Sequence, residues 1–171
     1  SIYVYRNEAD MRPAVATRSD DYDARVTTLG VAVDERTLIV LAAQDALEQT
    51  MAHELSHIVV GMATDNPYAG LPRWLDEGLA MLAEGELPAQ NAIALRLAIA
   101  ADELLSVRSM TSYSGRPDQV DLYYGECYSV VNYLIEEHGR DKMRELLDVF
   151  SEGILQDDAL IGAGSAFEAL M

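Results

Sequence analysis

The chain of 171 residues has a single cysteine, Cys127, so no disulfide can form within it. Because no cysteine pair is present, the sequence does not indicate the redox compartment. No run of about eighteen uncharged apolar residues occurs either, so we expect no membrane-spanning segment. Without such a segment, the chain is expected to fold around its own core.

Positive charge is scarce. The chain has 12 Lys and Arg residues against 29 Asp and Glu residues, which gives a formal net charge of −17 at pH 7. A surface of this kind repels phosphate backbones and anionic lipid, so nucleic acids and membrane surfaces are not expected partners. Hydrophobic residues make up 50% of the chain, enough for one sizeable core. We therefore expect one domain over residues 1–171, with an N-terminal αβ lobe over about residues 1–70 and a helical lobe over about residues 71–171.

The sequence begins at Ser1 and contains no charged segment followed by the apolar stretch of a signal peptide. Two alternatives stay open for its location. The protein is cytoplasmic with an unusual start, or it is extracytoplasmic and an upstream signal or anchor has been removed. The sequence does not indicate an oligomeric state.

Histidine is scarce too, yet two of the three histidines fall in the stretch AHELSHI at residues 52–58. In a helix, His53 and His57 would lie roughly 40° apart around the axis and about 6 Å apart along it, so both rings can reach one metal ion. Glu54 lies beside the same face, where it can take a proton from a water bound to that metal. Burying these polar groups without partners is costly, so the pattern predicts a metal site on a helix over about residues 46–62.

A second unusual stretch, LPRWLDEGLA, follows at residues 71–80. Pro72 suits the start of a helix, and Gly78 interrupts an otherwise apolar pattern. Asp76 and Glu77 place carboxylates where a core helix does not need them. A catalytic zinc commonly takes two His and one Glu and leaves its fourth position to water, so both carboxylates are candidates for a third ligand.

Together, HExxH and the following W-L-x-E-G-x-A segment resemble the gluzincin metallopeptidases, and the flanking sequence is most similar to the small bacterial peptidase MA-like hydrolases. The resemblance implies a thermolysin-like catalytic core that hydrolyses peptide bonds. It implies one Zn²⁺ per chain, bound by His53, His57 and Glu77, with Glu54 as the general base. Asp76 would then be an acidic residue in the first turn of a helix, where the macrodipole favours it.

A third segment, YGECYSVVNYLIEEHG at residues 124–139, resembles the part of the gluzincin aminopeptidases and their small relatives that carries a catalytic tyrosine. Counting back from the matched pair Tyr133-Leu134 places that residue at Tyr124. The resemblance implies that its hydroxyl donates a hydrogen bond to the oxyanion. Tyr123 and Tyr128 are competing candidates.

Two differences from the sequence patterns of known metallopeptidases limit what the resemblance implies. A metzincin requires Gly at position 60 and His at position 63, where this chain has Val60 and Ala63, so that family is excluded. The G-A-M-E-N strand with which the aminopeptidases hold a free amine has no counterpart. The sequence therefore does not distinguish endopeptidase from exopeptidase activity.

The expected fold class is α+β. A short strand over residues 2–5, a helix over 8–16 interrupted at Pro13, and a hairpin of strands over 29–33 and 37–42 would form a small mixed or antiparallel sheet packed on the HExxH helix. In gluzincins the strand beside that helix is an edge strand that pairs with extended peptide substrate. The remaining segments are expected as helices over 72–84, 88–105, 120–138 and 140–150, a loop over 106–119, and one or two short helices over 151–171.

Two other function classes compete with the enzyme. One is a binding or processing module that keeps its zinc without turning over substrate, and the other is a structural core with an accidental motif. All the residue types needed for catalysis are present, so the sequence favours a zinc metallopeptidase acting on a peptide or protein substrate.

Overall fold

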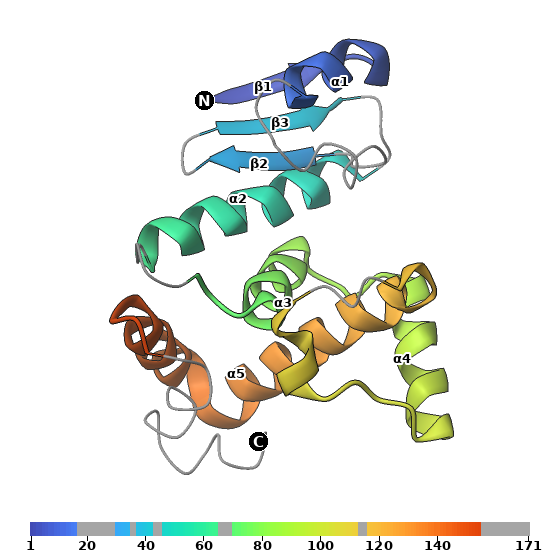
Figure 1. The fold of residues 1–171 in the computed structure, drawn as a ribbon, viewed down its shortest axis with the longest axis vertical. Coiled ribbons are helices and arrows are strands. Elements are labelled where there is room, and N and C mark those ends of the chain that lie inside the picture. The colour runs from blue at the N-terminus through green and yellow to red at the C-terminus, as the bar shows by residue number, and fades with distance from the viewer. Residues whose placement is uncertain (17–29, 35–36, 43–45, 65–69, 113–115, 155–171) are drawn as a thin grey trace.

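In the computed structural model, the described residues are those outside 17–29, 35–36, 43–45, 65–69, 113–115 and 155–171. The described elements are β1 (Ile2–Tyr5), α1 (Glu8–Ala16), β2 (Gly30–Asp34), β3 (Thr37–Leu41), α2 (Leu47–Ala63), α3 (Arg73–Glu84), α4 (Ala89–Ala101), two short 3₁₀ turns (Val107–Thr111 and Pro117–Gln119) and α5 (Val120–Ser151). Figure 1 shows the sheet and α1 at one end, the helices α3 to α5 at the other, and α2 between them. The chain is mostly helical with a small sheet, so the α+β expectation is confirmed at this level.

The sheet has three strands in the order β1-β3-β2. β2 and β3 are antiparallel, which confirms the predicted hairpin, whereas β1 runs parallel to β3. The sheet is therefore mixed, and a purely antiparallel sheet is excluded. A parallel pair needs a crossover connection, and α1, which follows β1 directly, begins that crossover.

The central strand β3 is deeply buried. Leu38, Ile39 and Val40 are all 0% exposed. Ile39 packs against Met11 and Val15 of α1. Because β3 is covered on both faces, it fixes the position of the two strands beside it.

α1 differs from its prediction, because it is continuous over Glu8–Ala16 with Pro13 inside it. Asn7 caps its start, where the side-chain Oδ1 accepts a hydrogen bond from the backbone N–H of Asp10 at 3.0 Å. Pro13 lies on the exposed side of the helix. The carbonyl that loses its backbone partner there can bond to water, which is why the proline does not end the helix.

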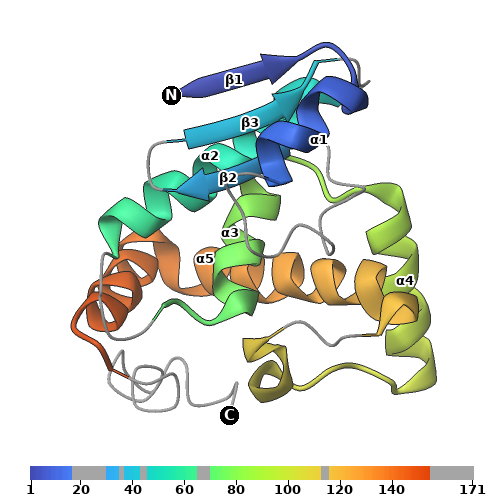
Figure 2. The ribbon, with the colours of Figure 1, turned by 45° about the horizontal axis from the view of Figure 1, so that its top comes forward.

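α2 packs against the sheet on one side and against α3 on the other (Figure 2). α3 in turn packs on α5, and Gly78 is the reason they can come so close. A Cβ at Gly78 would lie 2.4 Å from the carbonyl oxygen of Cys127 and 2.4 Å from Cγ2 of Val131. The glycine that interrupts the apolar pattern of α3 is therefore a contact point between helices, and Trp74 and Leu75, both 0% exposed, anchor the same core.

The helices predicted over 120–138 and 140–150 are the two parts of α5, which a kink separates at Gly139, where the angles of φ 82° and ψ 164° are not helical. This prediction is therefore confirmed. Two other boundaries in the helical half differ from expectation. α4 ends at Ala101 because Asp102 adopts the left-handed conformation. The predicted loop over 106–119 contains two 3₁₀ turns. The helices predicted beyond α5 lie almost entirely outside the described residues.

Among the helices of the described part of the chain, none is both long enough and apolar enough to cross a bilayer. The division into two lobes of one domain is not tested by these elements and stays a prediction.

Candidate metal centre

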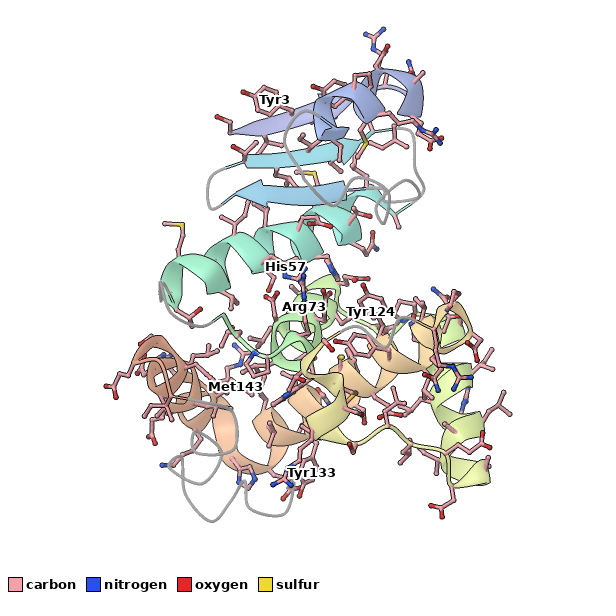
Figure 3. The ribbon with its side chains drawn as sticks, in the orientation of Figure 1. Tyr3, His57, Arg73, Tyr124, Tyr133 and Met143 are labelled. Carbon is pink, nitrogen blue, oxygen red and sulfur yellow. The ribbon has the colours of Figure 1, made fainter. Side chains whose placement is uncertain are left out.

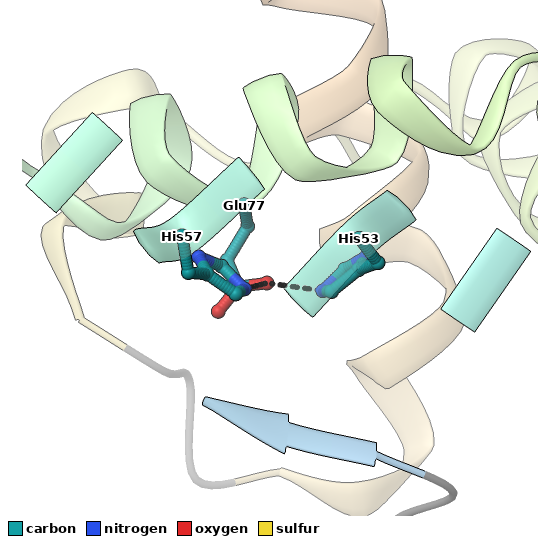
Figure 4. Close-up of side chains that lie close together, drawn as sticks. All are labelled: His53, His57 and Glu77. Carbon is teal, nitrogen blue, oxygen red and sulfur yellow. Dashed lines mark ion pairs between the residues drawn. The ribbon is translucent and has the colours of Figure 1, made fainter. Parts of the chain in front are cut away.

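Three predicted ligands come together between α2 and α3. α2 contributes His53 and His57, and α3 contributes Glu77, whose Oε2 lies 3.4 Å from Nε2 of His53 and 3.7 Å from Nε2 of His57. One ligand atom from each residue lies within 4.8 Å of the other two (Figure 4). Donors about 2.0–2.1 Å from a tetrahedral ion are about 3.3 Å apart, so this spacing fits a single small cation.

The burial of Glu77 supports the same conclusion. Its side chain is 3% exposed, and a carboxylate removed from water is costly without a charged or hydrogen-bonding partner. Here its Oε2 faces two imidazoles, and its Oε1 lies 3.6 Å from Nη1 of Arg73 on the same helix. The two oxygens of one carboxylate are thus directed toward different cationic groups.

The other ring nitrogen of each histidine is held by a second carboxylate of α3. Nδ1 of His57 lies 2.9 Å from Oδ1 of Asp76, and Nδ1 of His53 lies 2.6 Å from Oε1 of Glu84. An ionised carboxylate only accepts hydrogen bonds, so each Nδ1–H donates and each Nε2 is directed toward Glu77. Carboxylates in this position orient metal-binding histidines and fix their tautomer.

These contacts change the roles expected for two acidic residues. Asp76, the rival third ligand, contacts the Nδ1 side of His57 and is not in the group around Glu77. Its position in the first turn of α3 agrees with the macrodipole argument, but that argument missed its contact with the imidazole. Glu84 was not identified from the sequence at all. Its spacing of seven residues from Glu77, which is two helical turns, was the available signal.

The same carboxylates change the proton affinity of the imidazoles. Burial lowers the pKa of His53, but hydrogen bonds to Glu77 and Glu84 outweigh it and raise that pKa to about 10. Burial likewise lowers the pKa of His57, and the hydrogen bond to Asp76 with its charge raises it above the ordinary value. At neutral pH a metal ion must therefore displace a proton from His53 before it can bind.

Glu54 lies on the side of α2 that faces β2. Its side chain is half-buried, and its Cγ would be 3.1 Å from a Cβ built on Gly30 of that strand. Figure 4 shows the arrow of β2 running past the three ligands. Glu54 is adjacent to His53 in the chain and is not one of the grouped ligands, and its role as general base stays a prediction.

The three candidate tyrosines occupy different surroundings. Tyr123 is buried, and its hydroxyl donates a hydrogen bond to the carbonyl of Met110 at 3.2 Å. The Tyr128 hydroxyl lies 3.5 Å from the carbonyl of Gly85. Tyr124 is half-buried, with its ring 5.6 Å from that of Tyr123, and in the view of Figure 3 it lies in the same region as His57. The oxyanion role of Tyr124 stays a prediction.

Cys127 lies close to this centre, but its thiol is not activated for reaction. It is 0% exposed, and burial raises the pKa of its thiol. A buried thiol with a raised pKa is a poor nucleophile, so Cys127 serves the packing of α5.

The outer carboxylates give a first testable prediction. Asp76→Ala and Glu84→Ala should each weaken zinc binding by about 10-fold to 100-fold, because the histidines lose the group that orients them. Competition with a chromophoric chelator measures the Kd. Glu86→Ala is the matched control, since it removes an exposed acidic residue near the end of the same segment and should leave the Kd unchanged. Wild-type affinity in both outer variants would show that these contacts do not support the metal.

Comparisons with known proteins show which family the chain belongs to. A family model described as Peptidase MA superfamily matches residues 1–169. Peroxisome assembly protein 12 of the mouse (Mus musculus) is 38% identical over 64 residues, which cover 36% of this chain and 18% of that protein. The chain thus spans less than a fifth of the length of that curated relative, and no solved structure matches. Since the family model covers nearly the whole sequence, the chain belongs to the Peptidase MA superfamily, and this membership supports a peptidase in which His53, His57 and Glu77 could hold a metal ion.

Proposed function

We propose that the protein is a zinc-dependent metallopeptidase of the gluzincin type that hydrolyses peptide bonds. The observation that carries this proposal is the convergence of His53, His57 and Glu77, whose ligand atoms lie within 4.8 Å of one another. Two imidazoles and one carboxylate are the protein ligands of many catalytic zinc sites, and they leave a fourth position open. When bound, zinc lowers the pKa of a coordinated water from about 16 toward about 7.

Glu54 is the proposed general base. It follows His53 directly, so the backbone of α2 fixes it beside the ligands, and its half-buried position limits competition from bulk water. Its carboxylate takes a proton from the attacking water and delivers it to the leaving amine. Both steps need the same side chain in one place, which makes the position of Glu54 as important as its pKa.

The proposed substrate is a peptide or protein segment in extended conformation. Among the described strands, β2 pairs on one side only, with β3, and it lies against α2 beside Glu54. A peptide can add to such an edge through backbone hydrogen bonds and so needs no particular side chains. We propose that residues 1–171 form one catalytic domain in which the αβ part offers this strand and the helical part completes the metal site.

The test of the proposed function is hydrolysis by the zinc-loaded protein. A mixed-sequence peptide library analysed by mass spectrometry should show new termini that depend on zinc and disappear with a chelator. One bound zinc without any cleavage would contradict the enzyme and favour a zinc-retaining binding module. No bound zinc together with unchanged stability would favour a structural core.

A second prediction concerns Tyr124. If its hydroxyl stabilises the oxyanion, Tyr124→Phe should lower kcat by roughly a hundredfold, the usual loss when one oxyanion donor is removed. KM should change little, because the bond forms in the transition state. Steady-state kinetics with a fluorogenic peptide measures both constants.

Tyr123→Phe and Tyr128→Phe are the controls for this prediction. Tyr123→Phe removes a buried hydrogen bond to Met110, so it should cost about 1 kcal/mol of stability and little rate. A fully active Tyr124→Phe enzyme beside an inactive Tyr123→Phe enzyme would move the role to Tyr123. If all three variants stay active, the donor is another group.

A further inference from the structure

β2 contacts α2, the helix that carries Glu54, at a glycine. Gly30, the first residue of β2, is buried and pairs with Val40 of β3. A Cβ built on Gly30 would lie 2.7 Å from Cγ2 of Thr50 and 3.1 Å from Cγ of Glu54. The backbone of Gly30 is not among those with positive φ, so space and not backbone conformation requires the glycine.

The contact is made against one face of α2. Thr50 and Glu54 are four residues apart, so they are neighbours on the helix surface, and the bare backbone at Gly30 lies over both. The side chain of Glu54 therefore has β2 on one side. Its rotation is limited by the strand, and this limits where its carboxylate can go.

Neither the strand nor the helix can retreat easily from this contact. β2 is tied to β3, which is fully buried at Leu38, Ile39 and Val40. On its opposite side, α2 is held to α3 by the contacts of His53 with Glu84 and of His57 with Asp76. With both elements held, an added methyl group must displace the side chain of Thr50, displace that of Glu54 or tilt α2, and the last two changes move the carboxylate.

We infer that Gly30 is a positioning residue for Glu54. By carrying no side chain, it lets the edge strand press directly on the methylene groups of the base and fixes the spacing between that strand and α2. This inference rests on the proposed function, which assigns the proton transfer to Glu54. The spacing between β2 and α2 then fixes the distance from a peptide paired with β2 to the carboxylate of Glu54. An error of about 1 Å in such a distance can lower the rate by about a hundredfold.

The central test is Gly30→Ala. Its kcat should fall by about tenfold to a hundredfold. Zinc content should stay unchanged, because His53 and His57 point toward α3 and not toward Gly30. Gly61→Ala is the matched control, since it makes the same change in α2 where a Cβ meets nothing within 4 Å. It should keep the wild-type kcat.

A rescue separates positioning from a general loss of stability. In Gly30→Ala, the additional change Thr50→Ser removes the Cγ2 that causes the shortest clash and opens room away from Glu54. The double variant should recover part of the lost kcat. The readout besides activity is the visible spectrum of the cobalt(II)-loaded protein, whose pH midpoint should shift in Gly30→Ala, as in Glu54→Gln, and not in Gly61→Ala.

The outcomes separate this inference from the proposed function. A zinc-loaded wild type without peptidase activity, or a fully active Glu54→Gln variant, overturns the proposed function. An active wild type with Gly30→Ala within twofold of it in kcat, and with an unshifted cobalt spectrum, overturns the role of Gly30 alone. If Gly30→Ala does not fold, the double variant Gly30→Ala with Thr50→Ser tests the role of Gly30 in its place. A folded double variant with reduced kcat supports the inference, whereas wild-type kcat or a second failure to fold overturns it.

Discussion

Glu54→Gln is expected to lower kcat by roughly a hundredfold to ten-thousandfold while the protein keeps its zinc. Glutamine preserves the shape of the side chain and its contact with β2, but it cannot accept a proton at neutral pH. The zinc ligands are untouched, because Glu54 is not part of the grouped set. Steady-state kinetics on a fluorogenic peptide, combined with metal analysis of the same sample, measures both quantities.

Glu86→Gln is the control for this change. It makes the same substitution at an exposed position outside the site, and it should leave kcat unchanged. If Glu54→Gln retained wild-type kcat, the proton would have to be taken by another group. If Glu54→Gln lost its zinc, the residue would be a ligand and not a base.

The largest effect on metal binding is expected from the three ligands. His53→Ala, His57→Ala and Glu77→Ala should each reduce bound zinc from about one equivalent to a small fraction and abolish peptidase activity. Each change removes one of three protein donors, and for Glu77 the variant also leaves two imidazoles facing an empty space in the core. Metal content after dialysis against a metal-free buffer measures the loss.

Two matched variants sharpen this prediction. His138→Ala removes the third histidine of the chain, which lies on α5, and it should keep full zinc and activity. Asp76→Ala should weaken zinc binding less than Glu77→Ala, because it removes only the partner of Nδ1 on His57. Normal zinc binding by Glu77→Ala together with its loss in Asp76→Ala would mean that the third ligand is Asp76.

The grouping of His53 and His57 was predictable from the sequence because helical spacing alone brings them to one face. The helix itself was predicted over 46–62 and runs over Leu47–Ala63. Glu77 required more, since nothing in the sequence places α3 against α2. The resemblance to a known family supplied that link, and the distances now agree with it.

The features that could not be predicted from the sequence depend on contacts between elements that are far apart in the chain. Glu84 appears as an ordinary acidic residue at a helix end until α3 is seen against His53, 31 residues away in the chain. Gly30 appears as the start of a hairpin strand until β2 is seen against Glu54. The parallel pairing of β1 is a further case, because the pattern of one short apolar strand does not encode its direction relative to β3.

A glycine and a proline differ in how well they predicted helix boundaries. Gly139 adopts a positive φ that breaks the helical angles, so α5 has a kink between the two predicted helices. Pro13 was expected to interrupt α1 but lies on its exposed side. The glycine therefore marked a real break in the helix, whereas the exposed position of Pro13 lets α1 continue.

Anomalous scattering at the zinc absorption edge, measured on crystals of the zinc-loaded protein, tests the central claim most directly. The account predicts one strong peak per chain, about 2.0–2.1 Å from Nε2 of His53 and of His57 and about 2.0–2.2 Å from a carboxylate oxygen of Glu77. Asp76 and Glu84 should remain on the Nδ1 atoms. A peak bound by Asp76 or Glu84 in place of Glu77, or no peak between α2 and α3, would contradict it.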